Sequence, residues 1–194
     1  MSNLFRNLEL QAFKAGITPR SDESRDWFRR KAQALRRVNR ETLMREKELI
    51  RSPKHIVGSM QMFFYDPKHK QTLPYYDTFP LSIIIGPAEG GFMGLNLHYL
   101  PPTLRAKFLD SLLDLASNKT YDEDTKFNIR YSMLQKSTKF KYFKPCVKHY
   151  LSGHVRSRFS TVPATEWEIA TFLPTAQWQK TNSNKVYSQS RRMI

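Results

Sequence analysis

The chain has 194 residues, a formal net charge of +15 and a single cysteine, Cys146. This length allows one domain with an appendage and a core that needs no disulfide, and a lone cysteine excludes a disulfide framework or a multi-cysteine zinc site. Apolar runs such as residues 83–85 are far shorter than the roughly 18 residues of a membrane-spanning helix, so no membrane partner is expected.

The positive charge is unevenly distributed along the chain. Residues 20–51 carry +5 and residues 126–194 carry +11, whereas residues 52–125 carry −2. Basic segments on both sides of a nearly neutral centre predict a polyanionic partner, either nucleic acid or an acidic protein surface. The other interpretation is that the charge only keeps the chain soluble, but solubility does not require segregation.

Two helices are predicted near the N-terminus. The first covers residues 4–15 and ends at Gly16. The second starts after Ser21, a favourable N-cap, and runs to about residue 49 with Trp27 and Phe28 on its inner face. Its outer surface is basic, with Arg29, Arg30, Arg36, Arg37 and Arg40. That surface is either an ordinary solvated face or a contact with a macromolecular partner.

The central part of the sequence is typical of β-structure. Aromatic and branched residues predict strands over residues 60–65, 78–85 and 92–99. A turn is predicted at 66–70, and the glycine-rich segment 86–91 is predicted to be a hairpin loop. This order of strands favours a small, bent SH3-like β-barrel, although the pattern does not establish that the barrel closes.

The remaining segments are predicted to be mainly helical. Helices are expected over residues 101–115, 122–135 and 144–151, and a strand over residues 167–172. Residues 1–19 and 180–194 have too few apolar groups to offset the entropy of ordering, so both ends are predicted to be mobile in the isolated protein. Residues 175–194 are predicted to be an extended tail that needs a partner. The predicted fold is therefore α+β, with a basic helical arm (1–52), an α+β barrel domain (53–174) and a C-terminal tail (175–194).

No constellation of residues points to catalysis. The five histidines are scattered, and the glycines around residue 90 lie in a hairpin and not in a phosphate-binding loop. Cys146 lies three residues before His149, but a thiol–imidazole nucleophile also needs an orienting group and an oxyanion site. The sequence therefore predicts a protein that is not an enzyme and has no metal, cofactor or small-molecule substrate.

The strongest candidate for a binding site lies between residues 136 and 158. Its cations are Lys136, Lys139, Lys141, Lys144, Lys148, Arg156 and Arg158. Tyr142 and Phe143 lie among them as possible stacking residues. Cations bind phosphates and aromatic rings stack on unpaired bases, so the mixture fits a DNA contact. The same alternation would also arise if the aromatic residues were buried and the lysines solvated. Tyr75, Tyr76 and Phe79 have the same two interpretations, with a role as loop-anchoring core residues favoured.

Several segments carry a resemblance to a known family. They are 62–68 (MFFYDPK), 73–81 (LPYYDTFPL), 90–102 (GGFMGLNLHYLPP), 104–106 (LRA), 167–170 (WEIA), 172–174 (FLP) and 190–192 (SRR). Together they resemble small virion proteins of T4-like tailed bacteriophages, most closely the DNA end protector type. A head–tail or tail-tip component is the competing assignment. The resemblance covers roughly the last two thirds of the chain, and the first fifty residues contribute nothing to it.

This resemblance implies a function and a set of partners. A DNA end protector would bind the double-stranded end of packaged DNA, at or near the head–tail junction, and shield it from host exonuclease. Its other partners would be virion subunits, and it would be found in the virion after assembly in the host cytoplasm. The alternative is a purely structural neck, baseplate or tail-tip protein whose basic segments dock on neighbouring subunits.

Overall fold

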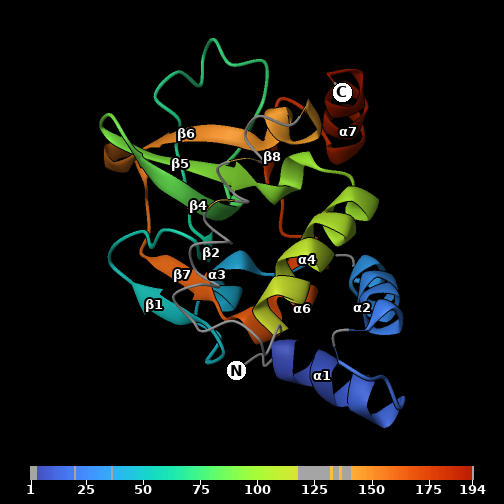
Figure 1. Ribbon diagram of the computed structural model, residues 1–194. Helices are drawn as coiled ribbons and strands as arrows, with labels where there is room; N and C mark the ends of the chain where they lie inside the picture. The colour runs from blue at the N-terminus through green and yellow to red at the C-terminus, as the bar shows by residue number, and fades with distance from the viewer. Residues whose placement is uncertain are drawn as a thin grey trace.

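A computed structural model describes residues 4–19, 21–35, 37–117 and 141–193, together with Ser132 and Lys136. Figure 1 shows a curled antiparallel sheet with most of the helices gathered along one side of it. The α+β class predicted from the sequence is confirmed. None of the helices in these described ranges is both long enough and apolar enough to cross a membrane.

The main sheet has six strands in the described part of the chain. They are β1 (Ile50–Ser52), β2 (Met60–Met62), β4 (Leu81–Ala88), β5 (Gly91–Asn96), β6 (Val147–Leu151) and β7 (Phe159–Val162). Neighbouring strands pair antiparallel in the order β1-β7-β2-β4-β5-β6, so β1 and β6 are the outer strands. A separate two-stranded ribbon joins β3 (Tyr76–Asp77) to β8 (Trp178–Gln179).

The sheet curls strongly but stays open. Phe92 on β5 and Phe159 on β7 are three strand spacings apart, or about 14 Å in a flat sheet. Their ring centroids are only 5.7 Å apart, because curvature brings them together around Phe63. No pairing joins β1 to β6 among the described residues, so the predicted SH3-like barrel is not confirmed.

The predicted strands are found with different limits. The strand predicted at 60–65 is continuous only over β2, with one isolated antiparallel bridge from Tyr65 to Val155, and the one predicted at 78–85 runs on to Ala88. The chain reverses only at Glu89 and Gly90, where Gly90 adopts a φ of 67° that favours glycine, so most of the predicted 86–91 loop is strand. The strand predicted at 92–99 ends at Asn96, whose side chain accepts the His98 N–H and starts a short 3₁₀ helix, η1 (Leu97–Tyr99).

Helices flank the sheet in the described residues. They are α1 (Leu4–Lys14), α2 (Asp22–Ala34), α3 (Arg40–Leu43), α4 (Pro102–Ser117), α6 (Trp167–Phe172) and α7 (Ser183–Arg192), with the 3₁₀ helices η2 (Lys141–Cys146), η3 (Ser152–His154) and η4 (Ala164–Glu166). Helix α1, the start of α2 and helix α4 match the predictions, and Ser21 caps α2 in a reciprocal pair with Ser24. The helix predicted over 122–135 lies outside the described residues, except for Ser132.

The second predicted helix was too long. Helix α2 ends at Ala34 because Leu35 turns to an extended conformation with a ψ of 114°. Asn39 then caps the short helix α3 by accepting the Thr42 N–H, and residues 50–52 form β1 instead of continuing a helix. The predicted helix over 144–151 was also wrong, since Val147–Leu151 is the outer strand β6, paired with β5.

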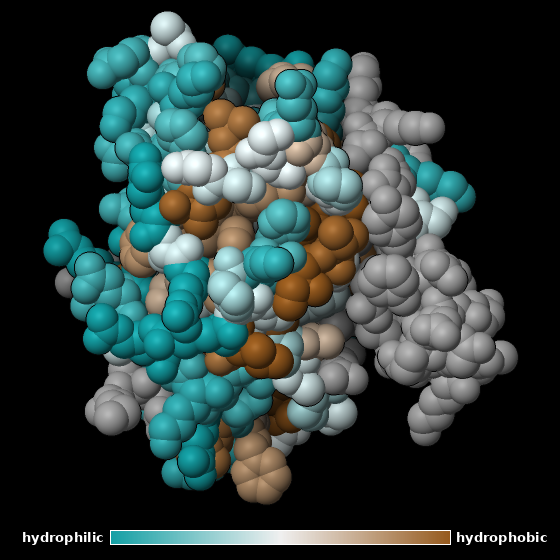
Figure 2. All heavy atoms as spheres, turned by 90° about the vertical axis from the view of Figure 1, so that its left-hand side faces the viewer, coloured by the Kyte–Doolittle hydropathy of each residue, from teal (hydrophilic) through white to brown (hydrophobic). Residues whose placement is uncertain are grey.

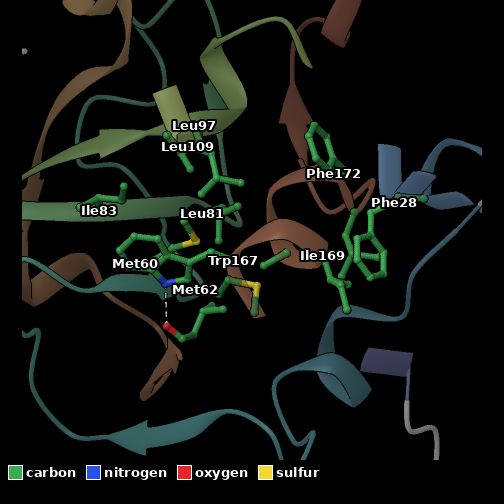
Figure 3. Close-up of a cluster of buried hydrophobic side chains, with 14 of the residues drawn as sticks. Phe28, Met60, Met62, Leu81, Ile83, Leu97, Leu109, Trp167, Ile169 and Phe172 are labelled. Carbon is green, nitrogen blue, oxygen red and sulfur yellow. Dashed lines mark hydrogen bonds between the residues drawn. The ribbon is translucent and has the colours of Figure 1, made fainter. Parts of the chain in front are cut away.

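Helix α6 is the centre of the core, where a strand was predicted. All six of its residues are buried, so its sequence lacks the periodicity that separates helix from strand. Figure 3 shows side chains of the sheet meeting one side of α6, with Phe28 of α2 beyond Ile169. The Trp167 indole N–H donates to the Val162 carbonyl at 2.9 Å and fixes the start of α6 against β7.

The two ends of the chain pack on this core. Phe5 of α1 and Val186 of α7 are fully buried, and the Ser190 hydroxyl donates to the Tyr99 carbonyl at 2.9 Å. The extended tail predicted for 175–194 is therefore wrong, because β8 and α7 order it against the chain's own surface. One buried cluster contains residues from all three predicted ranges, 1–52, 53–174 and 175–194, and their division into domains stays a prediction.

The surface of the molecule on the side of the sheet that faces away from the helices is mainly polar. Figure 2, which turns the left side of Figure 1 toward the viewer, shows hydrophilic residues around a broken central band of apolar ones. The large apolar side chains that are exposed in the described residues are Leu10, Phe13, Ile50, Ile56 and Met193.

A buried polar cluster joins the ribbon to the rest of the fold. The Asp77 carboxylate accepts hydrogen bonds from the Phe79 and Gln177 N–H groups, both at 3.0 Å, and from the Asn96 amide at 3.1 Å. The His98 Nδ1 lies 2.6 Å from Asp77 and its Nε2 lies 3.0 Å from the Thr175 hydroxyl. Burial alone would raise the pKa of Asp77, but His98 and the N–H donors outweigh it and lower the pKa. Burial, with the nearby arginines, lowers the pKa of His98 despite Asp77.

Acid should weaken the fold through His98. Because its pKa is lower in the folded state than the usual value of about 6.5, the unfolded chain binds a proton that the folded one excludes. Stability should fall as the pH drops below about 6.5, by up to about 1.4 kcal/mol per pH unit for this one group. Denaturant unfolding at several pH values measures this slope. A His98→Gln variant should be less stable at neutral pH and should lack that part of the slope; an unchanged slope would contradict the assignment.

Candidate nucleic-acid interface

A cleft of about 850 Å³ opens between the loop at residues 67–76 and the outer edge of the sheet. We call it the tyrosine cleft. Its aromatic lining is Tyr65, Tyr75, Tyr76, Tyr99 and Tyr150, and its basic lining is Lys68, His69, Lys144, Lys148 and His149. Two acids also line it: Asp77 is buried and engaged by its hydrogen bonds, and Glu89 is exposed.

The tyrosine rings of the cleft are held by packing. Tyr75 lies with its ring centroid 6.0 Å from Tyr99 and 6.1 Å from Trp178, and the Tyr99 and Trp178 rings meet edge to face at 4.8 Å. Burial raises the pKa of Tyr75 and, more strongly, that of Tyr99. Their hydroxyls therefore stay uncharged at neutral pH and do not repel an anion.

Lys148 is the distinctive charge of the cleft. Its Nζ lies 3.8 Å from the centroid of the Tyr99 ring, and no carboxylate among the described residues forms a salt bridge with it. Burial lowers the pKa of this lysine, and burial also raises the pKa of the neighbouring Cys146 thiol to about 12, so the thiol is no counterion. A half-buried cation without a paired anion creates a favourable place for one.

Strand pairing explains the space beside Lys148. In the register of β5 and β6, Lys148 lies opposite Gly94, and Tyr150 lies opposite Phe92 on the same face. A Cβ added at Gly94 would come within 2.3 Å of the Ser82 hydroxyl oxygen, so glycine is required for this close packing. The lysine therefore faces a residue without a side chain, which leaves its stem room to reach Tyr99.

The loop that forms the other wall is anchored by Lys180. Its ammonium donates to the carbonyls of Lys70, Gln71 and Leu73 at 2.8, 2.9 and 3.0 Å. At the start of the loop, the Tyr65 hydroxyl accepts the Leu151 N–H of β6 at 3.0 Å. The C-terminal segment and the sheet edge thus set the width of the cleft together.

A second basic site lies in a groove of about 350 Å³ beside β1 and β7. We call it the arginine groove. Arg45, Arg51 and Arg158 line it together with Glu41, Phe64 and Ser157, among other residues. The three arginines are exposed, and none of them forms a salt bridge with a described carboxylate. Exposed guanidinium groups of this kind suit phosphate oxygens.

The structure scatters the predicted site residues. Lys144 and Lys148 line the tyrosine cleft, and Arg158 lines the arginine groove. Arg156 is exposed 3.8 Å from Asp66. On α2, Arg29 pairs with Asp26 at 2.8 Å, and the Arg30 side chain reaches the Asp26 carbonyl at 3.4 Å.

Other predicted residues have different surroundings. Arg37 and Lys136 are exposed, whereas Arg40 donates to the carbonyls of Thr175 and Ala176, both at 2.8 Å. Phe143 packs on Phe108 with ring centroids 4.8 Å apart. Arg36, Lys139 and the side chains of Lys141 and Tyr142 lie outside the described part. Whether any of these residues contacts DNA stays a prediction.

Several residues of the two sites were not predicted from the sequence. Tyr65, His69 and Tyr99 were not singled out, because they come from two separate segments that only the fold brings together. Arg45 and Arg51 have no local pattern either, and Lys180 resembles any surface lysine. Tyr75 and Tyr76 were favoured as loop anchors. They are half-buried and line the cleft, while Phe79 is fully buried as expected for a core residue.

The Lys180 anchor can be tested without DNA. Lys180→Met removes three donors to the loop, so amide hydrogen exchange at residues 68–73 should become about tenfold faster or more, which corresponds to about 1.4 kcal/mol of local stability. The free energy of global unfolding should fall by no more than this same amount, because the contacts are lost only from the folded state. Lys185→Met removes a similar exposed charge from α7 and is the matched control. Equal exchange in both variants would contradict the anchoring role.

The chain also resembles a known protein family over nearly its whole length. Residues 1–193 match a family model described as the phage T4 terminal DNA protecting protein, so the match includes the first fifty residues as well as the segments noted in the sequence. No curated protein and no solved structure matches the chain. The family match spans nearly the whole sequence, and the chain therefore belongs to the family of phage T4 terminal DNA protecting proteins.

Proposed function

We propose that this bacteriophage protein binds the end of linear phage DNA and protects it from exonuclease by covering the terminus. Membership of the terminal DNA protecting family supports this function and disfavours a purely structural neck or tail-tip role. The observation in the fold that carries it is Lys148, a half-buried cation to which no described carboxylate is paired, in a cleft lined with tyrosines. Phosphates attract the cation, and bases stack on the rings.

Protection by covering the terminus needs no catalytic group. An exonuclease must reach the terminal phosphodiester, so a protein seated on the last nucleotides blocks it sterically. The groups that resemble catalytic ones have structural surroundings: Cys146 and His98 are both buried. No cluster of three or more potential metal-ligating side chains occurs in the described ranges.

We assign the two basic sites to different parts of the DNA end. The tyrosine cleft would hold the terminus, and the arginine groove would hold the phosphate backbone of the adjoining duplex. Phe64 lines the groove and the next residue, Tyr65, lines the cleft, so the two sites are neighbours along the chain. We place the protein in the virion near the head–tail junction, where an end of packaged DNA would lie, with neighbouring virion subunits as further partners.

End protection is directly measurable. The purified protein at micromolar concentration should slow digestion of linear duplex DNA by an exonuclease and should not protect a nicked circle of the same sequence from that enzyme. If about five phosphates are engaged, the logarithm of the binding constant should fall with that of the salt concentration with a slope of about −4 to −5. Linear DNA that is neither bound nor protected at low salt would contradict the proposal.

Removing the arginine groove should change the salt dependence. Arg51→Ala combined with Arg158→Ala should weaken binding to duplexes of any sequence and reduce the salt slope by about 2, because each phosphate contact contributes about 0.9. Both residues are exposed, so unfolding should be nearly unchanged. The matched control, Arg6→Ala with Lys14→Ala, removes the same charge from the exposed side of α1. If both pairs lower the slope equally, the groove is not a specific contact.

A further inference from the structure

We infer that the tyrosine cleft takes the last nucleotides of one DNA strand in unpaired form, so that the protein prefers an end with a short single-stranded overhang to a blunt end. This inference rests on the proposed function and specifies the substrate of its site. It follows from the size of the cleft, the nature of its walls and the placement of its single half-buried cation.

The size of the cleft favours one strand over a base-paired end. Clefts of about 300–1,000 Å³ enclose drug-sized ligands, and this one measures about 850 Å³. One or two nucleotides are ligands of that size. A duplex is not, since its major groove alone is about 12 Å wide. The cleft can therefore receive one strand, while the paired part of the DNA stays outside.

The walls of the cleft suit unpaired bases. Tyr75 and Tyr76 are half-buried, so both keep part of their surface exposed, and the Tyr75 ring is held by contacts with Tyr99 and Trp178. A base paired within a duplex stacks on its neighbours, whereas an unpaired terminal base can stack on an aromatic ring instead. Because every base has a flat π-face, this contact would not depend on sequence, as an end protector requires.

The charges of the cleft suit a strand with phosphate groups. Lys148 lies at the Tyr99 ring, and Lys144 is an exposed cation in the same lining. A phosphate near Lys148 would supply the anion that no described side chain provides. Glu89, the exposed acid of the lining, would disfavour phosphate on its side and so orient the strand.

Binding to three matched DNA duplexes tests the inference. All three have the same sequence and one end closed by a hairpin. The open end is blunt in the first duplex, carries two extra nucleotides on the 3′ strand in the second, and carries two extra nucleotides on the 5′ strand in the third. Overhanging ends avoid the cost of unpairing, so at least one of them should bind about tenfold more tightly than the blunt end. Fluorescent 2-aminopurine at the terminal unpaired position should be quenched by stacking on binding. The 5′-overhang duplex is also compared with a 5′-phosphate and with a 5′-hydroxyl. Tighter binding of the phosphorylated form would place the terminal phosphate at Lys148, and equal binding would place an internal phosphate there.

Variants identify the groups involved. Tyr75→Leu should remove the preference for the overhang, lowering its affinity about 5- to 100-fold, whereas Tyr75→Phe keeps the ring and should retain the preference. Lys148→Met should weaken binding to the overhang more than binding to the blunt duplex, and Lys185→Met is the control of equal charge. If Tyr75→Leu does not fold, the inference is tested by the quenching of 2-aminopurine with the unmodified protein and with Tyr75→Phe, and quenching is expected with both.

The outcomes separate this inference from the proposed function. Equal affinity for blunt and overhanging ends, with no quenching, would overturn the single-strand inference and leave end protection intact. Preference for an overhang that survives Tyr75→Leu and Lys148→Met would also overturn it, because the strand would then bind elsewhere. Failure to bind any of the three duplexes would overturn the proposed function itself.

Discussion

The buried carboxylate of Asp77 is the interaction on which the arrangement of the molecule depends. A carboxylate taken out of water is unstable unless hydrogen bonds replace its solvation. Here the donors come from three parts of the chain: Phe79 next to β3, Asn96 and His98 at the end of β5, and Gln177 beside β8. Satisfying one charge therefore requires the ribbon, the sheet and the C-terminal segment to meet at one place.

This meeting point positions the tyrosine cleft. Tyr76 precedes Asp77 and Tyr99 follows His98 in the sequence, while Trp178 follows Gln177 and packs on Tyr99. Arg105 strengthens the same region from α4. It is buried, and it donates to the carbonyls of Leu100, Thr171 and His98 and to the Tyr187 hydroxyl. The rings that line the cleft are thus attached to the most constrained part of the fold, which is the condition for a preorganised binding site.

Local signals in the sequence were good guides to the structure, and signals that depend on distant contacts were not. Ser21 was predicted to cap α2 because a cap needs only its own neighbours. The segment 167–172 was predicted to be a strand because burial on all sides hides its helical period. The fold of residues 175–194 was missed because their partners, Arg40, Arg105 and Tyr99, are far away in sequence. Likewise Lys148 was predicted as a binding residue from its basic and aromatic neighbours, but nothing in the sequence places Tyr75 and Tyr99 beside it.

The positive charge itself has two physical roles in this chain. Arg40, Arg105 and Lys180 direct their donors to backbone carbonyls and act as internal supports, so they hold the fold together where no helix or strand pairing does. Arg29 is largely neutralised by Asp26. Lys148, Arg51 and Arg158 have no such partner among the described residues, and they line the tyrosine cleft and the arginine groove. A net charge of +15 therefore overstates the number of phosphates that the protein can engage, because the charge available to DNA is set by which cations the fold leaves unpaired, and that is a property of the structure and not of the composition.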